Sequence, residues 1–219
     1  DISFTIESGE HVALVGPSGG GKSTIAKLIA GIYRPDSGRI CLNGKDITDL
    51  GVTERAKSGI SYAFQTPVRF KGITVSDILK IAAGRDLSVA ESCEFLSSVG
   101  LCARDYLDRE INNSLSGGEL KRIEIATVLA RKTPFAVFDE PEAGIDLWSF
   151  NSLIKVFENM RDAVHGSIVI ISHQERILNI ADRIIVISDG TVKKTGTREE
   201  ILPLLFSVDK LCDALKDKV

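Results

Sequence analysis

A glycine-rich stretch near the start of the chain constrains its fold more than any other feature. Its sequence, Gly16-Pro17-Ser18-Gly19-Gly20-Gly21-Lys22-Ser23-Thr24, fits the phosphate-binding template G-x-x-x-x-G-K-[ST]. The apolar run at residues 11–15 before it predicts a buried strand. A helix is predicted after it by apolar residues at helical spacing, namely Ile25, Leu28, Ile29 and Ile32. Because strand, loop and helix occur together, we expect a phosphate loop rather than a glycine-rich surface turn.

The chemistry of this loop follows from its residue types. Glycines allow consecutive backbone N–H groups to turn inward around an anion, and the helix behind them directs its positive dipole end to the same place. Lys22 adds a mobile charge for the outer phosphates, and the Ser23 hydroxyl is placed to ligate Mg²⁺. The sequence therefore predicts a site for a phosphate chain accompanied by Mg²⁺.

Composition narrows the class of protein further. The chain has 219 residues, of which 43% are hydrophobic, enough for one full α/β domain with a small subdomain. Its net charge of -3 gives no basic footprint, so we expect no nucleic-acid partner. The 4 cysteines have neither paired nor metal-ligand spacing, which favours free thiols in a reducing cytoplasm. The longest apolar runs have strand length, so any membrane role must come through a partner rather than by direct insertion.

Strands alternate with helices over residues 1–65 and 116–219, which predicts a largely parallel sheet with functional groups at the carboxyl ends of its strands. Ile2, Phe4 and Ile6 alternate with polar residues and predict a half-buried strand. Turns at Asn43-Gly44 and Asp189-Gly190 predict hairpins, and hence a small antiparallel portion. Residues 66–115 have helix starts and helical spacing instead, so we expect an inserted helical subdomain there.

Two further segments carry predicted chemistry. Asp139-Glu140 ends an apolar strand, where Asp139 is suited to hold the hydration shell of Mg²⁺ and Glu140 to take a proton from an attacking water. Ser116-Gly117-Gly118 opens a helix, and Ser116 with Glu119 forms a capping box. Glycines inside a helix cost about 1 kcal/mol each relative to alanine, so something must compensate. Bare amides and a serine hydroxyl at a helix N-terminus predict a second phosphate site.

These segments together resemble the ATP-binding-cassette (ABC) ATPases over essentially the whole chain. The matching motifs occur in the order of that family: Walker A at Gly16–Thr24, the Q-loop glutamine Gln65, the signature Leu115-Ser116-Gly117-Gly118-Glu119, Walker B at Phe135–Glu140, the D-loop Ala143-Gly144-Ile145-Asp146, and the switch histidine His173. The resemblance implies an Mg²⁺-dependent ATPase with ATP as its nucleotide.

The resemblance also implies how the motifs act. Two subunits close head to tail, so that Walker A of one and the signature of the other hold the same ATP. Gln65 contacts Mg²⁺ or the attacking water, His173 holds the γ-phosphate, and Asp146, counted with the nucleotide-site residues, communicates across the dimer. We therefore expect Glu140, His173 and Gln65 to act in catalysis, and Ser23, Gln65 and Asp139 at the metal.

Three departures from the family pattern bear on these expectations. Glu119 replaces the commoner glutamine of the signature, and the D-loop reads Ala-Gly-Ile-Asp rather than Ser-Ala-Leu-Asp. Family members stack adenine on an aromatic residue from a strand that would precede Asp1, so we expect that strand to be missing from this sequence and the affinity for nucleotide to be lower without it.

A finer resemblance is to the SufC-like ATPases of iron–sulfur cluster assembly. It rests on Ala63–Val68, Ser116–Ile125 and His173–Leu178, whereas Tyr33–Gly38 is typical of transporter subunits. We expect a cytoplasmic ATPase that dimerises on ATP and reshapes a soluble SufB/SufD-like scaffold. The alternative is the ATP-binding subunit of a membrane transporter, which would dock on a permease and lie at the membrane through it.

Overall fold

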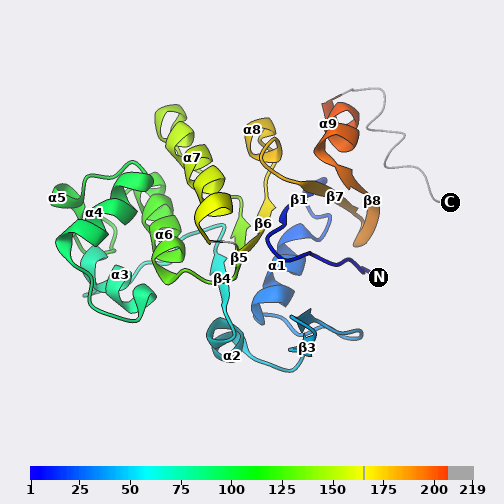
Figure 1. Ribbon diagram of the computed structural model, residues 1–219, viewed down its shortest axis with the longest axis horizontal. Coiled ribbons are helices and arrows are strands. Elements are labelled where there is room, and N and C mark those ends of the chain that lie inside the picture. Colours follow the sequence, from blue (N-terminus) through cyan, green and yellow to red (C-terminus); the bar gives the residue numbers. More distant parts are fainter. Residues whose placement is uncertain (165, 207–219) are drawn as a thin grey trace.

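The computed structural model describes residues 1–164 and 166–206 and has a six-stranded sheet at its centre (Figure 1). The strand order is β4-β5-β6-β1-β7-β8. The strands are β1 (His11–Val15), β4 (Ile60–Ala63), β5 (Phe135–Asp139), β6 (Ser167–Ile171), β7 (Arg183–Ser188) and β8 (Thr191–Thr197). Neighbours from β4 to β7 are parallel, and β8 is antiparallel to β7. The predicted α/β class with a largely parallel sheet is confirmed.

The sheet forms the core because helices cover both of its faces. Every side chain of β1 and of β6 is buried. Val12 and Leu14 of β1 pack with residues of α1 (Lys22–Ala30), while Ala13 and Val15 face α8 (Glu175–Leu178) and α9 (Arg198–Phe206). Burying a side chain of valine or leucine size contributes about 1.5–3 kcal/mol. This two-sided packing fixes the strand that leads into the phosphate loop.

The helical part lies to one side of the sheet, at the left of Figure 1. It contains α3 (Val75–Ala83), α4 (Val89–Ser98) and α5 (Ala103–Tyr106), and α3 and α4 pack against α6 (Gly117–Arg131). Capping boxes start two of these helices, at Thr74 with Asp77 and at Ser88 with Glu91. A helical subdomain is thus confirmed, and its boundaries at 66 and 115 stay a prediction. The long helix α7 (Leu147–Val164) packs between this part and the sheet.

A small antiparallel hairpin lies below α1 at the bottom of Figure 1, whereas α7 lies at the top. Its strands are β2 (Cys41–Leu42) and β3 (Lys45–Asp46), and α2 (Val52–Lys57) follows them. The turn residues Asn43 and Gly44 both have positive φ, of 51° and 76°, as a two-residue hairpin of the primed type requires. The antiparallel portion predicted from Asn43-Gly44 is confirmed.

The strand predicted at residues 2–6 is wrong. Ile2, Phe4 and Ile6 are half-buried against the core and the residues between them are exposed, as the alternation indicates. However, these residues form no strand within the described part of the chain. The alternation reports which side chains face the core, whereas a strand also needs a neighbouring backbone to pair with. Here the carbonyl of Thr5 accepts a hydrogen bond from the Arg183 guanidinium instead.

The described cysteines, Cys41, Cys93 and Cys102, are free thiols, as predicted, and Cys212 and His165 lie outside the described residues. Within residues 1–164 and 166–206, none of the helices has the length and apolar character needed to cross a bilayer.

Candidate functional site

Four of the predicted motifs converge on one edge of the sheet. Strands β4, β5, β6 and β1 are parallel neighbours, so their carboxyl ends lie along the same edge. The phosphate loop follows β1, Gln65 follows β4, Asp139-Glu140 ends β5, and His173 follows β6. Segments far apart in the sequence are therefore adjacent at this edge, which is where open α/β sheets bind ligands.

The phosphate loop has the backbone that its glycines predict. Gly16 has a φ of 143°, and a Cβ at this position would lie 1.8 Å from the Ile187 carbonyl oxygen, so only glycine fits. Pro17, Ser18 and Gly19 are exposed at the rim. Helix α1 begins at Lys22 with no side-chain hydrogen bond at its N-cap, Gly21. The N–H groups of the first turn are thus available to an anion.

Lys22 is held inside this loop. Its Nζ donates hydrogen bonds to the carbonyl oxygens of Gly16, at 2.7 Å, and Pro17, at 2.9 Å. Burial lowers the pKa of Lys22, and the nearby Glu140 and Asp139 carboxylates oppose that shift. A phosphate chain in the loop would offer this ammonium stronger acceptors than two neutral carbonyls.

Ser23 and Asp139 form an oxygen pair that suits Mg²⁺. The Ser23 hydroxyl donates to Asp139 Oδ1 at 3.1 Å, and the hydroxyl of Tyr62 donates to Asp139 Oδ2 at 3.1 Å. Asp139 is 1% exposed. A hydroxyl and a carboxylate beside a phosphate loop are ligands that Mg²⁺ accepts, either directly or through its waters, so the residues present fit this ion.

Tyr62 is a site residue that sequence reasoning missed. Burial and the adjacent Asp139 carboxylate raise the pKa of its phenol, so it remains a hydrogen-bond donor. Its ring packs edge to face on Phe64, with centroids 4.7 Å apart. No local signal identifies Tyr62, since its contact with Asp139 exists only because β4 pairs with β5.

Gln65 and Glu140 are in direct contact. Gln65 Nε2 donates to Glu140 Oε2 at 2.8 Å. Glu140 has a φ of 48°, in the left-handed region, and its N–H donates to the Ile171 carbonyl at 3.0 Å. A carboxylate beside an amide donor at the strand end can accept a proton from water while the amide orients it.

His173 lies at the same edge with its side chain exposed. Among the described residues, no hydrogen bond joins its imidazole to the rest of the site. The backbone before it is anchored, because Ser172 Oγ donates to Glu142 Oε1 at 2.5 Å and accepts the Gln174 N–H at 3.0 Å. Burial raises the pKa of Glu142, a second residue that the sequence did not single out.

The Ser116-Gly117-Gly118 segment starts α6, and the predicted capping box is confirmed. Ser116 Oγ accepts the Glu119 N–H at 3.2 Å, and the Ser116 N–H donates to Glu119 Oε2 at 2.6 Å. A Cβ at Gly117 would meet nothing within 4 Å, whereas a Cβ at Gly118 would lie 2.6 Å from the Gly144 carbonyl oxygen. The D-loop therefore explains one glycine, and the open space beside Gly117 is free for a ligand.

Glu119 has contacts of its own in place of the family's glutamine. Its Oε1 accepts the Tyr106 hydroxyl at 2.5 Å and lies 3.3 Å from Arg109 Nη1. The hydrogen bond from Tyr106 is the main reason that the pKa of Glu119 falls to about 2. Glu119 thus joins α5 to the start of α6.

Asp146, the last residue of the D-loop, is exposed and caps the start of α7. Its Oδ1 accepts the Ser149 N–H at 3.0 Å, and its Oδ2 accepts the Ser149 hydroxyl at 2.7 Å. The structure thus gives Asp146 a local capping contact, and its role across a dimer stays a prediction.

Comparisons with known proteins agree with this site. Residues 1–143 match the family model described as ABC transporter. The chain is 40% identical over 208 residues to an uncharacterized ABC transporter ATP-binding protein of Methanocaldococcus jannaschii, covering 91% of this chain and 83% of that protein. It is 36% identical over 207 residues to the lipopolysaccharide export system ATP-binding protein LptB of Acidithiobacillus ferridurans, covering 92% and 85%.

Among solved structures, the ATP-binding subunit of an ABC transporter is 26% identical and has a TM-score of 0.81, covering 99% of this chain and 92% of that one. These relatives are described as transport proteins, and the comparisons do not support the finer resemblance to iron–sulfur assembly ATPases. The chain belongs to the ABC transporter family and is an ATPase of the ATP-binding-cassette type.

Proposed function

We propose that this chain is the ATP-binding, ATP-hydrolysing subunit of a membrane transport system, and that it works as a pair of subunits closed over ATP. The observation that carries the proposal is the convergence, at one sheet edge, of the phosphate loop with the Ser23–Asp139 and Gln65–Glu140 contacts. The transport role is supported by the names of the relatives, an ABC transporter ATP-binding protein and the ATP-binding protein of an export system.

The phosphates of ATP occupy the loop at residues 16–24. Lys22 exchanges its two carbonyl partners for the outer phosphate oxygens. The free N–H groups in the first turn of α1 face the phosphates of ATP. Ser23 and Asp139 would hold Mg²⁺, which would supply positive charge to the phosphate oxygens.

Glu140 then acts as the general base. It accepts the proton of the attacking water, a contribution of about 10²–10⁴-fold in rate. Gln65, already hydrogen-bonded to Glu140, orients that water. His173 reaches the γ-phosphate from its exposed position after β6.

The second subunit completes the site. The Ser116 hydroxyl and the amides at Gly117 and Gly118 start α6, and the open space beside Gly117 admits a phosphate. In the described part of the chain, no hydrogen bond joins this segment to the phosphate loop of the same molecule. In a head-to-tail pair, the signature segment of each subunit faces the phosphate loop of the other. Each ATP is then held by one phosphate loop and one signature segment.

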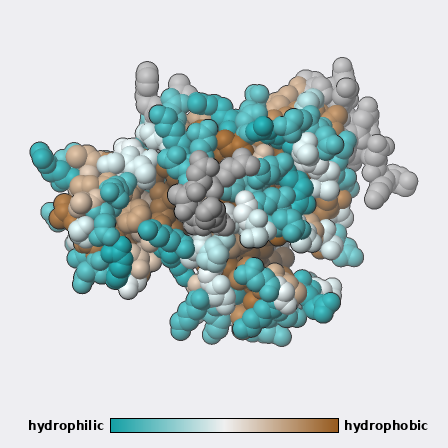
Figure 2. Space-filling model, viewed as in Figure 1, coloured by the Kyte–Doolittle hydropathy of each residue, from teal (hydrophilic) through white to brown (hydrophobic). Residues whose placement is uncertain are grey.

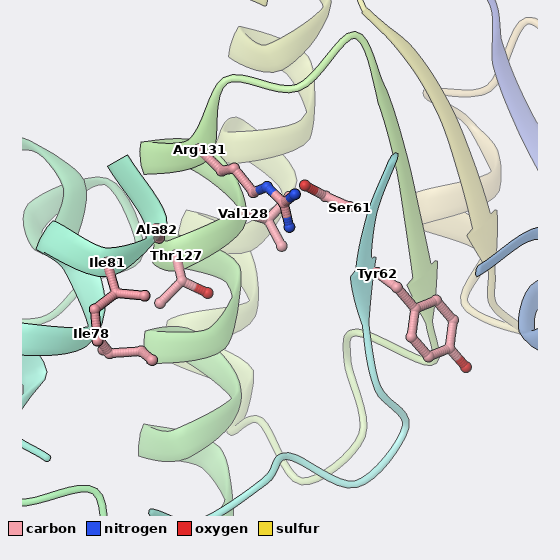
Figure 3. Close-up of a pocket in the computed structure, with 8 residues that line it drawn as sticks. All are labelled: Ser61, Tyr62, Ile78, Ile81, Ala82, Thr127, Val128 and Arg131. Atoms are coloured by element: carbon pink, nitrogen blue, oxygen red, sulfur yellow. The ribbon is translucent and has the colours of Figure 1, made fainter. Parts of the chain in front are cut away.

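A groove between β4, α3 and α6 supports docking of the permease (Figure 3). Its volume is about 390 Å³, and its lining includes Ile78, Ile81, Ala82, Val128 and Arg131. Ile81 is 64% exposed, and Phe64, Val68 and Phe70 are further exposed apolar side chains between β4 and α3. Figure 2 shows hydrophobic residues at the surface of the helical part, at left. Exposed apolar groups of this kind indicate a protein partner.

An iron–sulfur assembly ATPase is the second candidate, favoured by the SufC-like segments at 63–68, 116–125 and 173–178. Its partner would be a soluble SufB/SufD-like scaffold. The experiment that separates the candidates is an affinity purification of the E140Q variant with ATP from its native cells, followed by mass spectrometry. Recovery of a multi-span permease supports transport, and recovery of a β-rich scaffold without membrane spans supports the second candidate.

A further inference from the structure

Lys121, on α6, is completely buried, with 0% of its side chain exposed. Lysine is almost never fully buried unless it is paired. Its Nζ donates to the carbonyl oxygen of Phe64 and also lies 3.3 Å from the carbonyl oxygens of Gln65 and Asp139. This single ammonium therefore bridges the end of β4 and the end of β5.

Glu124, one helical turn after Lys121, completes the arrangement. Its Oε2 lies 3.6 Å from Lys121 Nζ, and its Oε1 accepts the Phe64 N–H at 2.9 Å. The backbone of Phe64 is thus held twice from α6, at its N–H by Glu124 and at its carbonyl by Lys121. Burial, the largest cause, raises the pKa of Glu124 to about 7.

The backbone contacts of Lys121 and Glu124 lie next to the hydrogen bond between Gln65 and Glu140. Phe64 and Gln65 are successive residues, as are Asp139 and Glu140, and Gln65 Nε2 donates to Glu140 Oε2. Neither Lys121 nor Glu124 touches the side chains of Gln65 or Glu140 through a hydrogen bond among the described residues. Their action is on the backbone that carries those side chains.

A buried ion pair is a weak way to stabilise a fold, because desolvation of the two charges offsets most of their attraction. Apolar residues of similar volume often do as well or better. Here, apart from the ion pair itself, the contacts go to backbone groups at the ends of β4 and β5, next to Gln65 and Glu140.

We propose that Lys121 and Glu124 are positioning residues for hydrolysis, which fix the backbone of Phe64-Gln65 to that of Asp139-Glu140 and tie both to α6. Because Ser116, Gly117 and Gly118 start the same helix, any displacement of α6 by the second subunit or a partner moves Gln65 with it. This inference rests on the roles proposed above for Gln65 and Glu140.

The test compares the double variant K121M/E124M with wild type in the full-length protein. Replacing both residues leaves no unpaired charge in the interior. We expect the thermal midpoint to stay near wild type, because apolar residues of similar volume often replace a buried ion pair without loss of stability. The Kd for ATP should also stay near wild type, because the phosphate loop is untouched. The kcat should fall by about 10–100-fold, since a misplacement near 1 Å costs up to about 100-fold. A folded double variant with kcat within about twofold of wild type would overturn the proposal, because no positioning effect of this size would then exist.

The Q65A substitution distinguishes a positioning role, exerted through Gln65, from a purely structural role. The measurement is the kcat of Q65A combined with K121M/E124M. If the pair acts through Gln65, adding Q65A to K121M/E124M lowers kcat by less than about twofold further, as expected for residues acting as one unit. If the two effects multiply, the pair does not act through Gln65. A wild-type kcat for Q65A alone would refute the role of Gln65 itself, and this proposal with it.

A matched pair of single variants covers the case in which the double variant does not fold. E124Q keeps an oxygen acceptor for the Phe64 N–H, whereas E124M removes it. We expect E124Q to retain a kcat within about threefold of wild type and E124M to lose about tenfold or more, as for other lost positioning contacts. Equal kcat values for E124Q and E124M would contradict the proposal.

Discussion

The two signature glycines predict opposite responses to the same substitution. In G118A, the new Cβ would lie 2.6 Å from the Gly144 carbonyl oxygen, a backbone atom that must move. Overpacking of this kind costs about 1–3 kcal/mol. The gain in helix propensity from glycine to alanine is at most about 1 kcal/mol. With that gain subtracted, G118A should be destabilised by up to about 2 kcal/mol, or up to roughly 8 °C in Tm for a chain of this size.

G117A is the matched control, because its Cβ would meet nothing within 4 Å. The same propensity term then acts alone, so its Tm should equal that of wild type or exceed it by up to about 4 °C. Differential scanning fluorimetry without nucleotide measures both. ATP turnover by G117A should nevertheless fall, since the added methyl occupies the space proposed for phosphate. Equal Tm values for G117A and G118A would refute the packing argument.

Three other perturbations test separate parts of the site. K22A should weaken ATP binding by roughly 100-fold, since hydrogen bonds to charged groups contribute about 1.5–3 kcal/mol each, and unchanged affinity in calorimetry would contradict the phosphate-loop assignment. Y62F removes the donor to Asp139 Oδ2 and should raise the Mg²⁺ concentration that half-saturates ATPase activity about tenfold; an identical Mg²⁺ titration would exclude this role. The raised pKa of Glu124, about 7 against an ordinary 4.5, means that the folded state binds its proton more tightly, so wild-type stability falls as pH rises through that window. E124Q lacks this titration, so its Tm relative to wild type should increase from about pH 5 to about pH 8, and a constant difference would show that Glu124 does not titrate there.

Local features of the fold were predictable because they depend on residues that are neighbours in the sequence. The strand, loop and helix around Lys22 each follow from adjacent side chains, as do the capping boxes at Ser88 and Ser116. The convergence of Asp139 and Ser23 was also predictable, because parallel strands share a carboxyl edge. The strand order was not, since the placement of β6 between β1 and β5 depends on packing of distant segments.

The failures have specific physical causes. The alternation at Ile2, Phe4 and Ile6 encodes burial but not the presence of a pairing strand, so the strand predicted there is wrong. The burial of Lys121 could not be predicted from the sequence pattern, because a lysine in a helix ordinarily indicates an exposed face. Its burial depends on carbonyl acceptors just after β4 and at the end of β5, which are distant in the sequence.

The sequence also does not reveal why position 118 requires a glycine. The sequence shows that a glycine there is costly, but not that the Gly144 carbonyl fills the space where a side chain would lie. The finer assignment to a SufC-like ATPase rested on short local patterns, which the comparisons with relatives do not support.

The measurement that tests the central claim most directly is single-turnover ATP hydrolysis by the E140Q variant, with its oligomeric state followed by sedimentation. Glutamine at this position still accepts a hydrogen bond from Gln65 but cannot take the proton of water. The account predicts that E140Q binds ATP, hydrolyses it about 10²–10⁴-fold more slowly than wild type, and accumulates as an ATP-bound dimer. Hydrolysis at the wild-type rate, by a protein that stays monomeric with ATP, would contradict it.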